Sequence, residues 1–231
     1  CLLSDYLDGR SSNRGACVQA CRWKYEIRAL NPTNGETGFL PLEEDERGAY
    51  ILNGKDLNML SALGELEKAG VNSFKIEGRM KSEYYLATVV NAYRRAMDGA
   101  DTAVCERELC ATAHRNFTKA YAYGKDGAKK TEEYAAGQIK GEYDYAANVI
   151  SCENGVLRAE MRNRFKSGDK LNVLSPGAFH GKDFTVGEMF SETDGVKTTD
   201  AKRVQGVYSF ACEYPLHAGD ILRKKATEAR Q

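Results

Sequence analysis

The chain has 231 residues, 42 % of them hydrophobic and 29 % charged, which is normal for a globular protein and allows one large domain or two small ones. Its 33 basic and 33 acidic residues give a formal net charge of zero, so no overall field favours nucleic acid or a membrane. No apolar run approaches the roughly 18 residues that a membrane span needs. The seven cysteines show no secreted disulfide pattern, so we expect a cytoplasmic protein without a membrane partner.

The first 34 residues lack a regular hydrophobic period and contain Cys1, Cys17 and Cys21. Thiolates four residues apart, with a third cysteine upstream, can converge on one centre, and sulfur ligands favour zinc or an iron–sulfur cluster. No histidine lies near these cysteines in the sequence, which favours iron–sulfur over zinc; a set of buried thiols is the alternative. Basic residues outnumber acidic ones here, so Arg14 and Arg22 are candidate contacts for an anionic partner, with an ordinary surface as the alternative.

Residues 49–97 alternate between strand and helix patterns. We expect strands at 49–52 and 71–76 and helices at 56–69 and 83–97, with Gly70 ending the first helix. Leucines every three residues mark the first helix, and an apolar stripe at helical spacing marks the second. A strand–helix–strand unit predicts a parallel sheet.

Residues 71–82 carry the strongest candidate site in this part. An apolar strand breaks at Gly78 into a charged turn, and Ser82 is a suitable N-cap for the helix that follows. In α/β folds, ligands bind at the carboxyl ends of strands. Arg79 could grip a carboxylate or phosphate bidentately, and Glu77 could act as a base or orient Arg79. A solvated loop with surface ion pairs is the alternative.

From residue 138 the pattern changes to short alternating runs separated by glycine turns, which predicts a small antiparallel β-barrel. Strands are expected at 143–151, 156–162, 170–174, 185–190, 206–214 and 221–223. One hairpin has a basic face that could follow a phosphate backbone or be a solvated surface; it comprises Arg158, Arg162, Arg164, Lys166 and Lys170. Cysteines 152 and 212 fall in expected strands, where cysteine acts as a small hydrophobe.

Several blocks resemble the peptidase U32 family, in the same order as in that family. They are Cys1–Ser4, Asn13–Cys17, Cys21–Trp23, Glu43–Asp45, Tyr50–Leu57 and Phe74–Ser82, the last followed by a tyrosine-rich helix. The resemblance implies an α/β fold: the C-terminal portion of a (β/α) barrel-like domain at residues 1–100, a connector at 101–137, and a small β-barrel domain at 138–231. The chain begins at a cysteine, and together with the resemblance this indicates a fragment.

The resemblance also implies an activity: hydroxylation of a base in tRNA or rRNA, assisted by an iron–sulfur centre and in some members using prephenate. Cys1, Cys17 and Cys21 would then be three ligands of a [4Fe–4S] cluster, with the fourth upstream of this fragment, because the family commonly has another cysteine a few residues before the position of Cys1. In some members a fourth ligand instead sits at the position of Asn58, but asparagine is not a thiolate. Glu77 and Arg79 are the expected catalytic residues, and Arg14, Arg22 and Lys81 the expected substrate contacts.

Two other functions are compatible with the sequence. The family name implies a metal-dependent or collagenase-like peptidase, but the three histidines lie late in the chain, away from the N-terminal cysteines, which argues against a papain-like Cys–His pair. An RNA- or protein-binding module without turnover is the third, because the family's C-terminal barrel is similar to those of translation factors.

Overall fold

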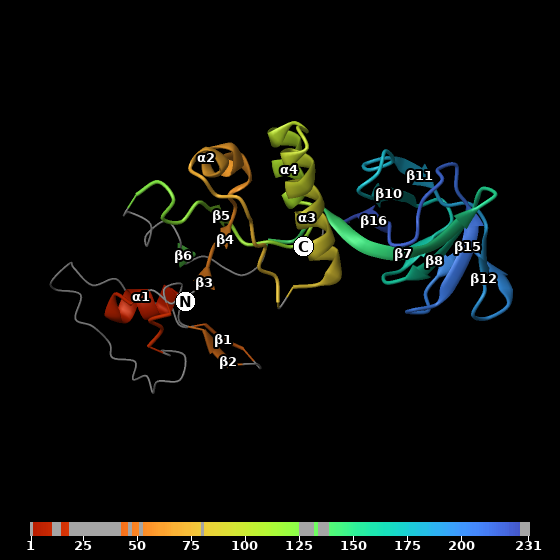
Figure 1. Cartoon of the computed structure of the whole chain (residues 1–231). Helices are drawn as coiled ribbons and strands as arrows, with labels where there is room; N and C mark the ends of the chain where they lie inside the picture. Colours follow the sequence, from red (N-terminus) through yellow and green to blue (C-terminus); the bar gives the residue numbers. More distant parts are fainter. Residues whose placement is uncertain are drawn as a thin grey trace. The chain divides into compact units, whose positions relative to one another are not determined.

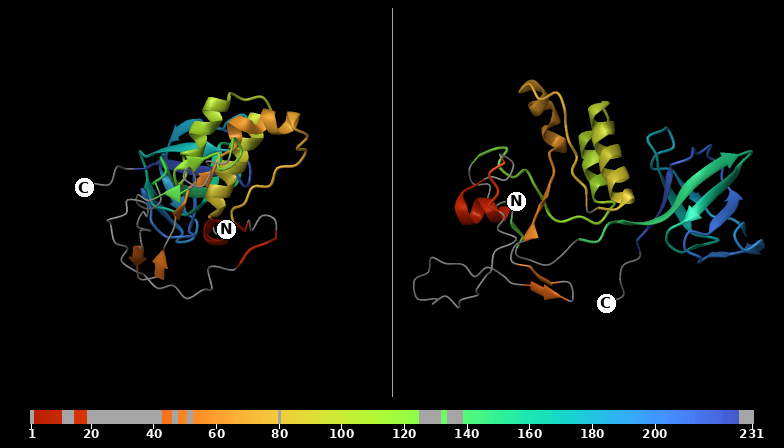
Figure 2. Two further views of the ribbon diagram at one scale, coloured as in Figure 1. Left: turned by 90° about the vertical axis from the view of Figure 1, so that its left-hand side faces the viewer. Right: turned by 60° about the horizontal axis from the view of Figure 1, so that its bottom comes forward.

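The computed structural model describes residues 2–10, 15–18, 43–45, 48–50, 53–79, 81–124, 132–133 and 139–226 (Figures 1 and 2). The chain divides into two compact units. The first combines Cys1–Met59 with Arg115–Ile139, and the second combines Leu60–His114 with Lys140–Gln231. Within the described ranges, no helix is long and apolar enough to cross a membrane.

The described part of the first unit contains helix α1 (Leu2–Asp8) and three short strand pairs. Strands β1 (Glu43–Asp45) and β2 (Gly48–Tyr50) are antiparallel, as are β3 (Asn53–Gly54) and β6 (Glu132–Glu133), whereas β4 (Asp56–Leu57) and β5 (Phe117–Thr118) are parallel. The carboxylate of Asp56 accepts hydrogen bonds from Arg115 Nε at 3.1 Å, Arg115 Nη2 at 2.9 Å and the Arg115 backbone N–H at 2.9 Å. This ion pair fixes the start of the parallel pair.

The second unit begins with helices. A 3₁₀ turn, η4 (Leu60–Ala62), leads into α2 (Leu63–Lys68), and α3 (Glu83–Met97) and α4 (Thr102–Leu109) follow. Helix α3 begins where the sequence predicts, because Ser82 Oγ accepts a hydrogen bond from the Tyr85 N–H at 3.2 Å. Gly70 ends α2 as expected: its φ is +90°, its N–H donates to the Glu67 carbonyl, and the Val71 N–H donates to the Leu66 carbonyl.

Two expectations for this region are wrong. Residues 71–78 form no strand, and positions 56–62 form β4 and η4, so that the helix begins only at Leu63. The apolar alternation at 71–76 favours an extended chain, but a strand also needs a partner that its own sequence does not specify. The described parallel pairing is the one between β4 and β5, and the (β/α) barrel-like arrangement is not observed in the described part of the chain.

The C-terminal part is a curled antiparallel sheet (Figure 1). Its order is β11-β10-β16-β7-β8-β15-β12-β13, so β11 and β13 are its edges and it forms half of a barrel. The strands are β7 (Tyr143–Glu153), β8 (Val156–Met161), β10 (Lys170–Leu174), β11 (Asp183–Thr185), β12 (Met189–Ser191), β13 (Val196–Thr198), β15 (Val207–Ala211) and β16 (Ile221–Lys225). A separate pair joins β9 (Phe165–Lys166) to β14 (Asp200–Ala201).

Alternating residues of these strands fill the inside of the curl. The most buried large side chains there are Leu157, Met161, Phe165, Leu171, Val173, Met189, Tyr208 and Leu222. Phe165 packs edge-on against both Tyr208 and Phe210, at ring-centre distances of 6.3 and 5.9 Å. Cys152 of β7 packs against this cluster and Cys212, which directly follows β15, belongs to it, so both act as small hydrophobes as the sequence predicts.

Candidate functional site

Part of the predicted cysteine and arginine site lies within the described residues. Cys17 is exposed, while Cys1, Cys21, Arg14 and Arg22 lie outside the described part of the chain. Among the described residues, no three His, Cys, Asp or Glu side chains are grouped closely enough to hold a metal ion. The ligand set Cys1, Cys17 and Cys21 therefore stays a prediction.

The Glu77-Gly78-Arg79 turn is exposed and precedes helix α3. The Lys75 and Glu77 side chains form an ion pair, with Nζ and Oε2 3.2 Å apart, in solvent. A Cβ at Gly78 would lie 2.3 Å from Leu86 Cδ2, so a larger residue here would require the Leu86 side chain to move. Arg79 is exposed, and Lys81 Nζ lies 4.5 Å from the centre of the Tyr85 ring. The turn therefore presents Glu77 and Arg79 to solvent immediately before a helix N-terminus, where a bound anion is favoured.

The start of α3 is attached to the C-terminal sheet. Glu83 Oε1 accepts a hydrogen bond from Tyr145 OH at 2.8 Å and forms an ion pair with Arg162 Nη2 at 3.0 Å. Arg162 also pairs with Glu160 at 3.3 Å. Burial, together with the hydrogen bond to Glu83, raises the pKa of Tyr145 to about 12, so this phenol stays protonated and donates. The turn with Arg79 and Lys81 thus leads directly into a helix end that the β7–β8 hairpin holds in place.

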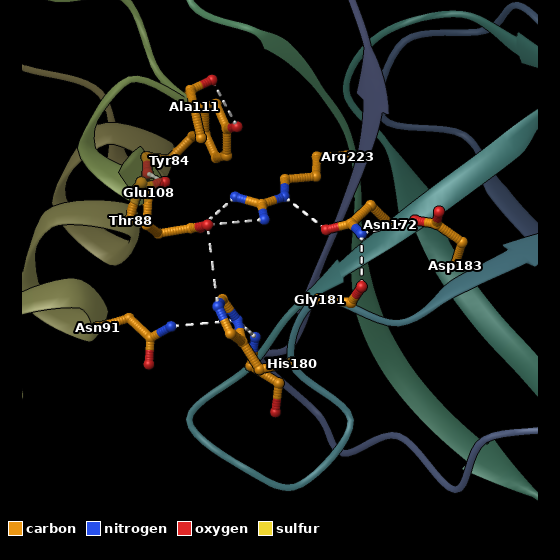
Figure 3. Close-up of polar contacts among 11 residues, drawn as sticks. Tyr84, Thr88, Asn91, Glu108, Ala111, Asn172, His180, Gly181, Asp183 and Arg223 are labelled. Carbon is orange, nitrogen blue, oxygen red and sulfur yellow. Dashed lines mark hydrogen bonds and ion pairs between the residues drawn. The ribbon is translucent and has the colours of Figure 1, made fainter. Parts of the chain in front are cut away.

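A buried polar cluster, hereafter the junction network, connects the helices with the sheet (Figure 3). At its centre the guanidinium of Arg223 in β16, only 3 % exposed, forms a bidentate ion pair with Glu108 of α4. Arg223 Nε donates to Asn172 Oδ1 at 2.8 Å, and its Cζ lies 4.5 Å from the centre of the Tyr143 ring. Burial alone would lower the pKa of Arg223, but the hydrogen bonds and charge of Glu108 outweigh it and raise the pKa. This arginine is therefore always charged.

His180 completes the junction network. Its Nδ1 accepts from Asn91 Nδ2 at 3.2 Å and lies 3.5 Å from the Ser175 N–H, which leaves the proton on Nε2, 3.9 Å from Glu108 Oε2. Burial lowers the pKa of His180, although the charge of Glu108 opposes the shift. The imidazole therefore faces an amide and a carboxylate that is already paired with Arg223.

The contacts of the junction network indicate that its role is to hold the helices and the sheet together. The two ionic partners satisfy each other, and the surrounding polar groups have partners of their own: Tyr84 OH donates to the Ala111 carbonyl at 3.1 Å, and Asn172 Nδ2 donates to the Gly181 carbonyl at 3.0 Å and to Asp183 Oδ1 at 2.6 Å. A buried ion pair with such complete compensation holds two elements in one geometry. Sequence reasoning missed it, because Arg223 and Glu108 are 115 positions apart and neither belongs to a motif.

The predicted basic hairpin is largely neutralised by carboxylates from other elements. Arg158 forms a bidentate pair with Glu192, with Nε–Oε1 and Nη2–Oε2 distances of 2.8 and 2.7 Å. Arg164 binds Asp200 in the same manner, at 2.9 and 2.5 Å. Since Arg162 is held by Glu83 and Glu160, the hairpin does not present a continuous row of unpaired arginines.

Comparison with known proteins agrees with the N-terminal motifs and the C-terminal sheet. Residues 1–132 match the model of peptidase family U32, and residues 141–223 match the model of the peptidase family U32 C-terminal domain. The chain belongs to peptidase family U32.

Among its curated relatives are the tRNA hydroxylation protein P1 of Bacillus subtilis, 28 % identical over 97 % of this chain and 54 % of the relative, and the tRNA hydroxylation protein P of Escherichia coli, 31 % identical over 76 % and 48 %. A collagenase of Porphyromonas gingivalis is 30 % identical over 76 % of this chain and 49 % of the relative. The chain spans about half the length of these relatives. A crystal structure of the C-terminal domain of a Geobacillus thermoleovorans protein described as a U32 peptidase matches 36 % of this chain and 93 % of that chain, with a TM-score of 0.33 and 21 % identity.

Proposed function

We propose that this chain forms part of an enzyme that hydroxylates a base in tRNA. The observation that carries the proposal is the similarity to the Bacillus subtilis tRNA hydroxylation protein P1, which extends over 97 % of this chain. The Porphyromonas gingivalis collagenase matches 76 % of it. An activity for which both units are needed is more consistent with a relative that matches nearly the whole chain.

The chemistry requires a source of the hydroxyl group. Replacing a hydrogen of the base by a hydroxyl oxidises the base by two electrons, so the donor of the hydroxyl has to be reduced by the same amount. A prephenate-like donor meets this balance, because it can lose a hydroxyl and gain the hydrogen. Such a donor carries carboxylates, which the exposed guanidinium of Arg79 can bind bidentately, with Lys81 and the amino end of α3 close by.

Three thiolates are the expected holders of a metal centre. Cys17 is exposed, so its sulfur is accessible to a cluster, and its spacing from Cys21 suits two ligands of one centre, with Cys1 as a third. A bound iron–sulfur cluster would supply electron transfer or activation of the hydroxyl donor. In this proposal Glu77 acts as the base for the proton of the nucleobase, and Arg79 and Lys81 orient anionic groups. Arg14 and Arg22 add positive charge that attracts RNA.

The collagenase relatives favour peptidase activity as the second candidate. A cysteine or serine peptidase needs a histidine beside its nucleophile. The imidazole of His180 lies beside Asn91 and Glu108 instead.

The test uses full-length protein produced in cells that lack the gene, with mass spectrometry of nucleosides from total tRNA. Wild type is expected to restore a hydroxylated nucleoside. Arg79→Ala should reduce its formation roughly ten- to hundredfold, the effect of losing a charged hydrogen bond, and Arg79→Lys should recover only part, because lysine cannot bind bidentately. Lys68→Ala, an equally exposed cation of the same unit, is the matched control and should have no effect.

Anaerobic purification adds a second measurement. Wild type should contain iron and acid-labile sulfide, and Cys17→Ala and Cys21→Ala should each lose them. Loss of hydroxylation in these variants together with the metal would support the proposal. Unchanged tRNA combined with cleavage of gelatin or casein, abolished by Glu77→Gln, would overturn it in favour of a peptidase.

A further inference from the structure

A group of four cations lies on the separate β9–β14 pair and directly beside it, and is hereafter called the basic rim: Arg164, Lys166, Lys202 and Arg203. The β9–β14 pair brings its members together, with Lys166 opposite Asp200 and Phe165 opposite Ala201. Lys202 and Arg203 lie in the loop after β14, and hydrogen bonds from the backbone of this loop hold it in place. The Arg203 N–H donates to Tyr208 OH at 3.1 Å, and the Gln205 N–H donates to the Met161 carbonyl at 2.9 Å. The basic rim is therefore part of the ordered fold.

Only half of this charge is compensated locally. Arg164 pairs with Asp200, and Arg203 Nη1 pairs with Asp194 Oδ1 at 2.5 Å. The side chains of Lys166 and Lys202 are exposed, and neither Nζ forms an ion pair with a described residue. The hydrogen bond from Arg164 and the nearby charges of Lys166 and Lys202 lower the pKa of Asp200, which shows that both lysines act on the same small area. The four cations of the basic rim are therefore paired with two carboxylates, those of Asp194 and Asp200.

The basic rim is close to the turn that carries Arg79. Arg162 binds Glu83 in the first turn of α3, and Lys166 follows Arg162 by four residues, at most about 14 Å along an extended chain. Arg79 precedes Ser82 by three residues, at most about 11 Å. Lys166 and Arg79 are therefore each four residues, or at most about 14 Å of chain, from the two residues that contact each other, Arg162 and Glu83, so that one polyanion can reach both groups of cations.

We propose that the basic rim binds backbone phosphates of the RNA substrate and holds the C-terminal sheet on the RNA while a base reaches the Arg79 turn; this inference rests on the proposed function. Exposed lysines on an ordered part of the fold are suited to binding phosphates, which accept hydrogen bonds from any direction. The arginines keep their carboxylate partners, so the lysines supply the free positive charge. Because such contacts do not read bases, the rim confers affinity and leaves sequence choice to the active site.

The test measures binding of unmodified tRNA to the full-length protein by fluorescence anisotropy across a range of salt concentrations. Lys166→Glu/Lys202→Glu should weaken binding roughly tenfold and reduce the slope of log Kd against log salt by about 0.7 to 0.9 for each phosphate that the rim no longer neutralises. Lys182→Glu/Lys225→Glu is the matched control, because these lysines are equally exposed but lie at the β10–β11 turn and at the end of β16. It should bind within twofold of wild type, and circular dichroism should show that both variants are folded.

The outcomes separate this inference from the proposed function. If wild type hydroxylates tRNA and both double variants bind tRNA with equal affinity, the inference that the basic rim binds RNA is overturned and the proposed function is unaffected. Rim-dependent tRNA binding without any hydroxylated nucleoside would overturn the function and keep the rim as an RNA surface. Absence of tRNA binding by wild type would overturn both, as would rim-dependent binding of an acidic protein in place of RNA.

Discussion

Arg223 of β16 donates from Nη2 to Glu108 Oε2 of α4 at 3.1 Å, and its second terminal nitrogen binds the other oxygen of the same carboxylate. The pair joins a strand of the C-terminal sheet to the helical part of the same unit. Its compensation is nearly complete, with Asn172 on Nε and the Tyr143 ring against the guanidinium plane. The pair therefore attaches β16 to α4, and the first turn of α3, which follows the Arg79 segment, is held separately by the contacts of Glu83 with Tyr145 and Arg162.

Neutralising Glu108 should strongly reduce the stability of the folded protein. Glu108→Gln leaves the charge of Arg223 buried without a counter-charge, and we expect a loss of about 3 kcal/mol in the free energy of unfolding. Urea denaturation followed by circular dichroism measures it. The matched control is Glu192→Gln, which removes the carboxylate of a bidentate pair with the more exposed Arg158 and should cost about 1 kcal/mol or less. Equal losses in the two variants would contradict a special role for the buried pair.

The stability of this junction should depend on pH through His180. Burial lowers the pKa of this histidine in the folded protein below its ordinary value of 6.5. The unfolded chain therefore binds a proton that the folded chain resists, so the contribution is fully present above about pH 6.5 and is lost as the pH falls from there towards the lower folded pKa. The groups that face the imidazole are Asn91 of α3, Glu108 of α4, Arg95 of α3 and Arg223 of β16.

Thermal melting between pH 7.5 and 5 tests this dependence. Wild type should lose stability steeply below about pH 6.5, and His180→Gln should show a smaller slope, because glutamine can keep the contact with Asn91 without titrating. Direct titration of the His180 ring by NMR provides the second readout. A folded pKa at or above the ordinary value would contradict the prediction.

Local signals in the sequence predict several elements correctly. Helix α3 spans Glu83–Met97 as expected, because a side-chain N-cap and an apolar stripe at helical spacing agree. Strand β10 also has its predicted bounds, Lys170–Leu174. The expected strand at 71–76 is wrong because pairing depends on a partner elsewhere. Strands β11 and β12 replace one expected strand at 185–190, since Gly187 lies within a break that alternation alone does not mark.

The candidate site was predicted less completely for the same reason. The turn with Glu77 and Arg79 has a local signature, and both side chains are exposed, while their functional role stays a prediction. The pairing of the hairpin arginines depends on Glu83, Glu192 and Asp200, which lie between 34 and 79 positions away, and sequence charge alone could not show it. The unpaired positive charge is instead contributed by lysines of two separate segments, one of them outside the predicted hairpin.

The entry of the chain into β7 leaves no room for a side chain at Gly141. A Cβ there would lie 2.5 Å from the Thr112 carbonyl carbon and 2.7 Å from the Ala111 carbonyl oxygen, and both are backbone atoms that cannot move aside easily. Gly141→Ala should therefore destabilise the protein by about 1–3 kcal/mol. Gly64→Ala is the matched control in α2, where a Cβ meets nothing within 4 Å, and it should stabilise by about 0.4–1 kcal/mol. Similar melting temperatures for the two variants would contradict this packing argument.

The hydroxyl of Tyr208 should position the basic rim. It accepts the Arg203 N–H at 3.1 Å, while its buried ring packs against Phe165. Tyr208→Phe keeps the ring but removes the acceptor, so the Arg203 amide should exchange faster with deuterium, and stability should fall by about 1–2 kcal/mol. Affinity for tRNA should fall roughly two- to threefold, less than on charge reversal, because Lys202 and Arg203 remain. Tyr214→Phe removes a hydroxyl that donates to the Asp183 carbonyl at 3.2 Å, away from the rim, and should leave tRNA affinity unchanged. If both variants bind tRNA equally well, the hydroxyl stabilises the fold without positioning the rim.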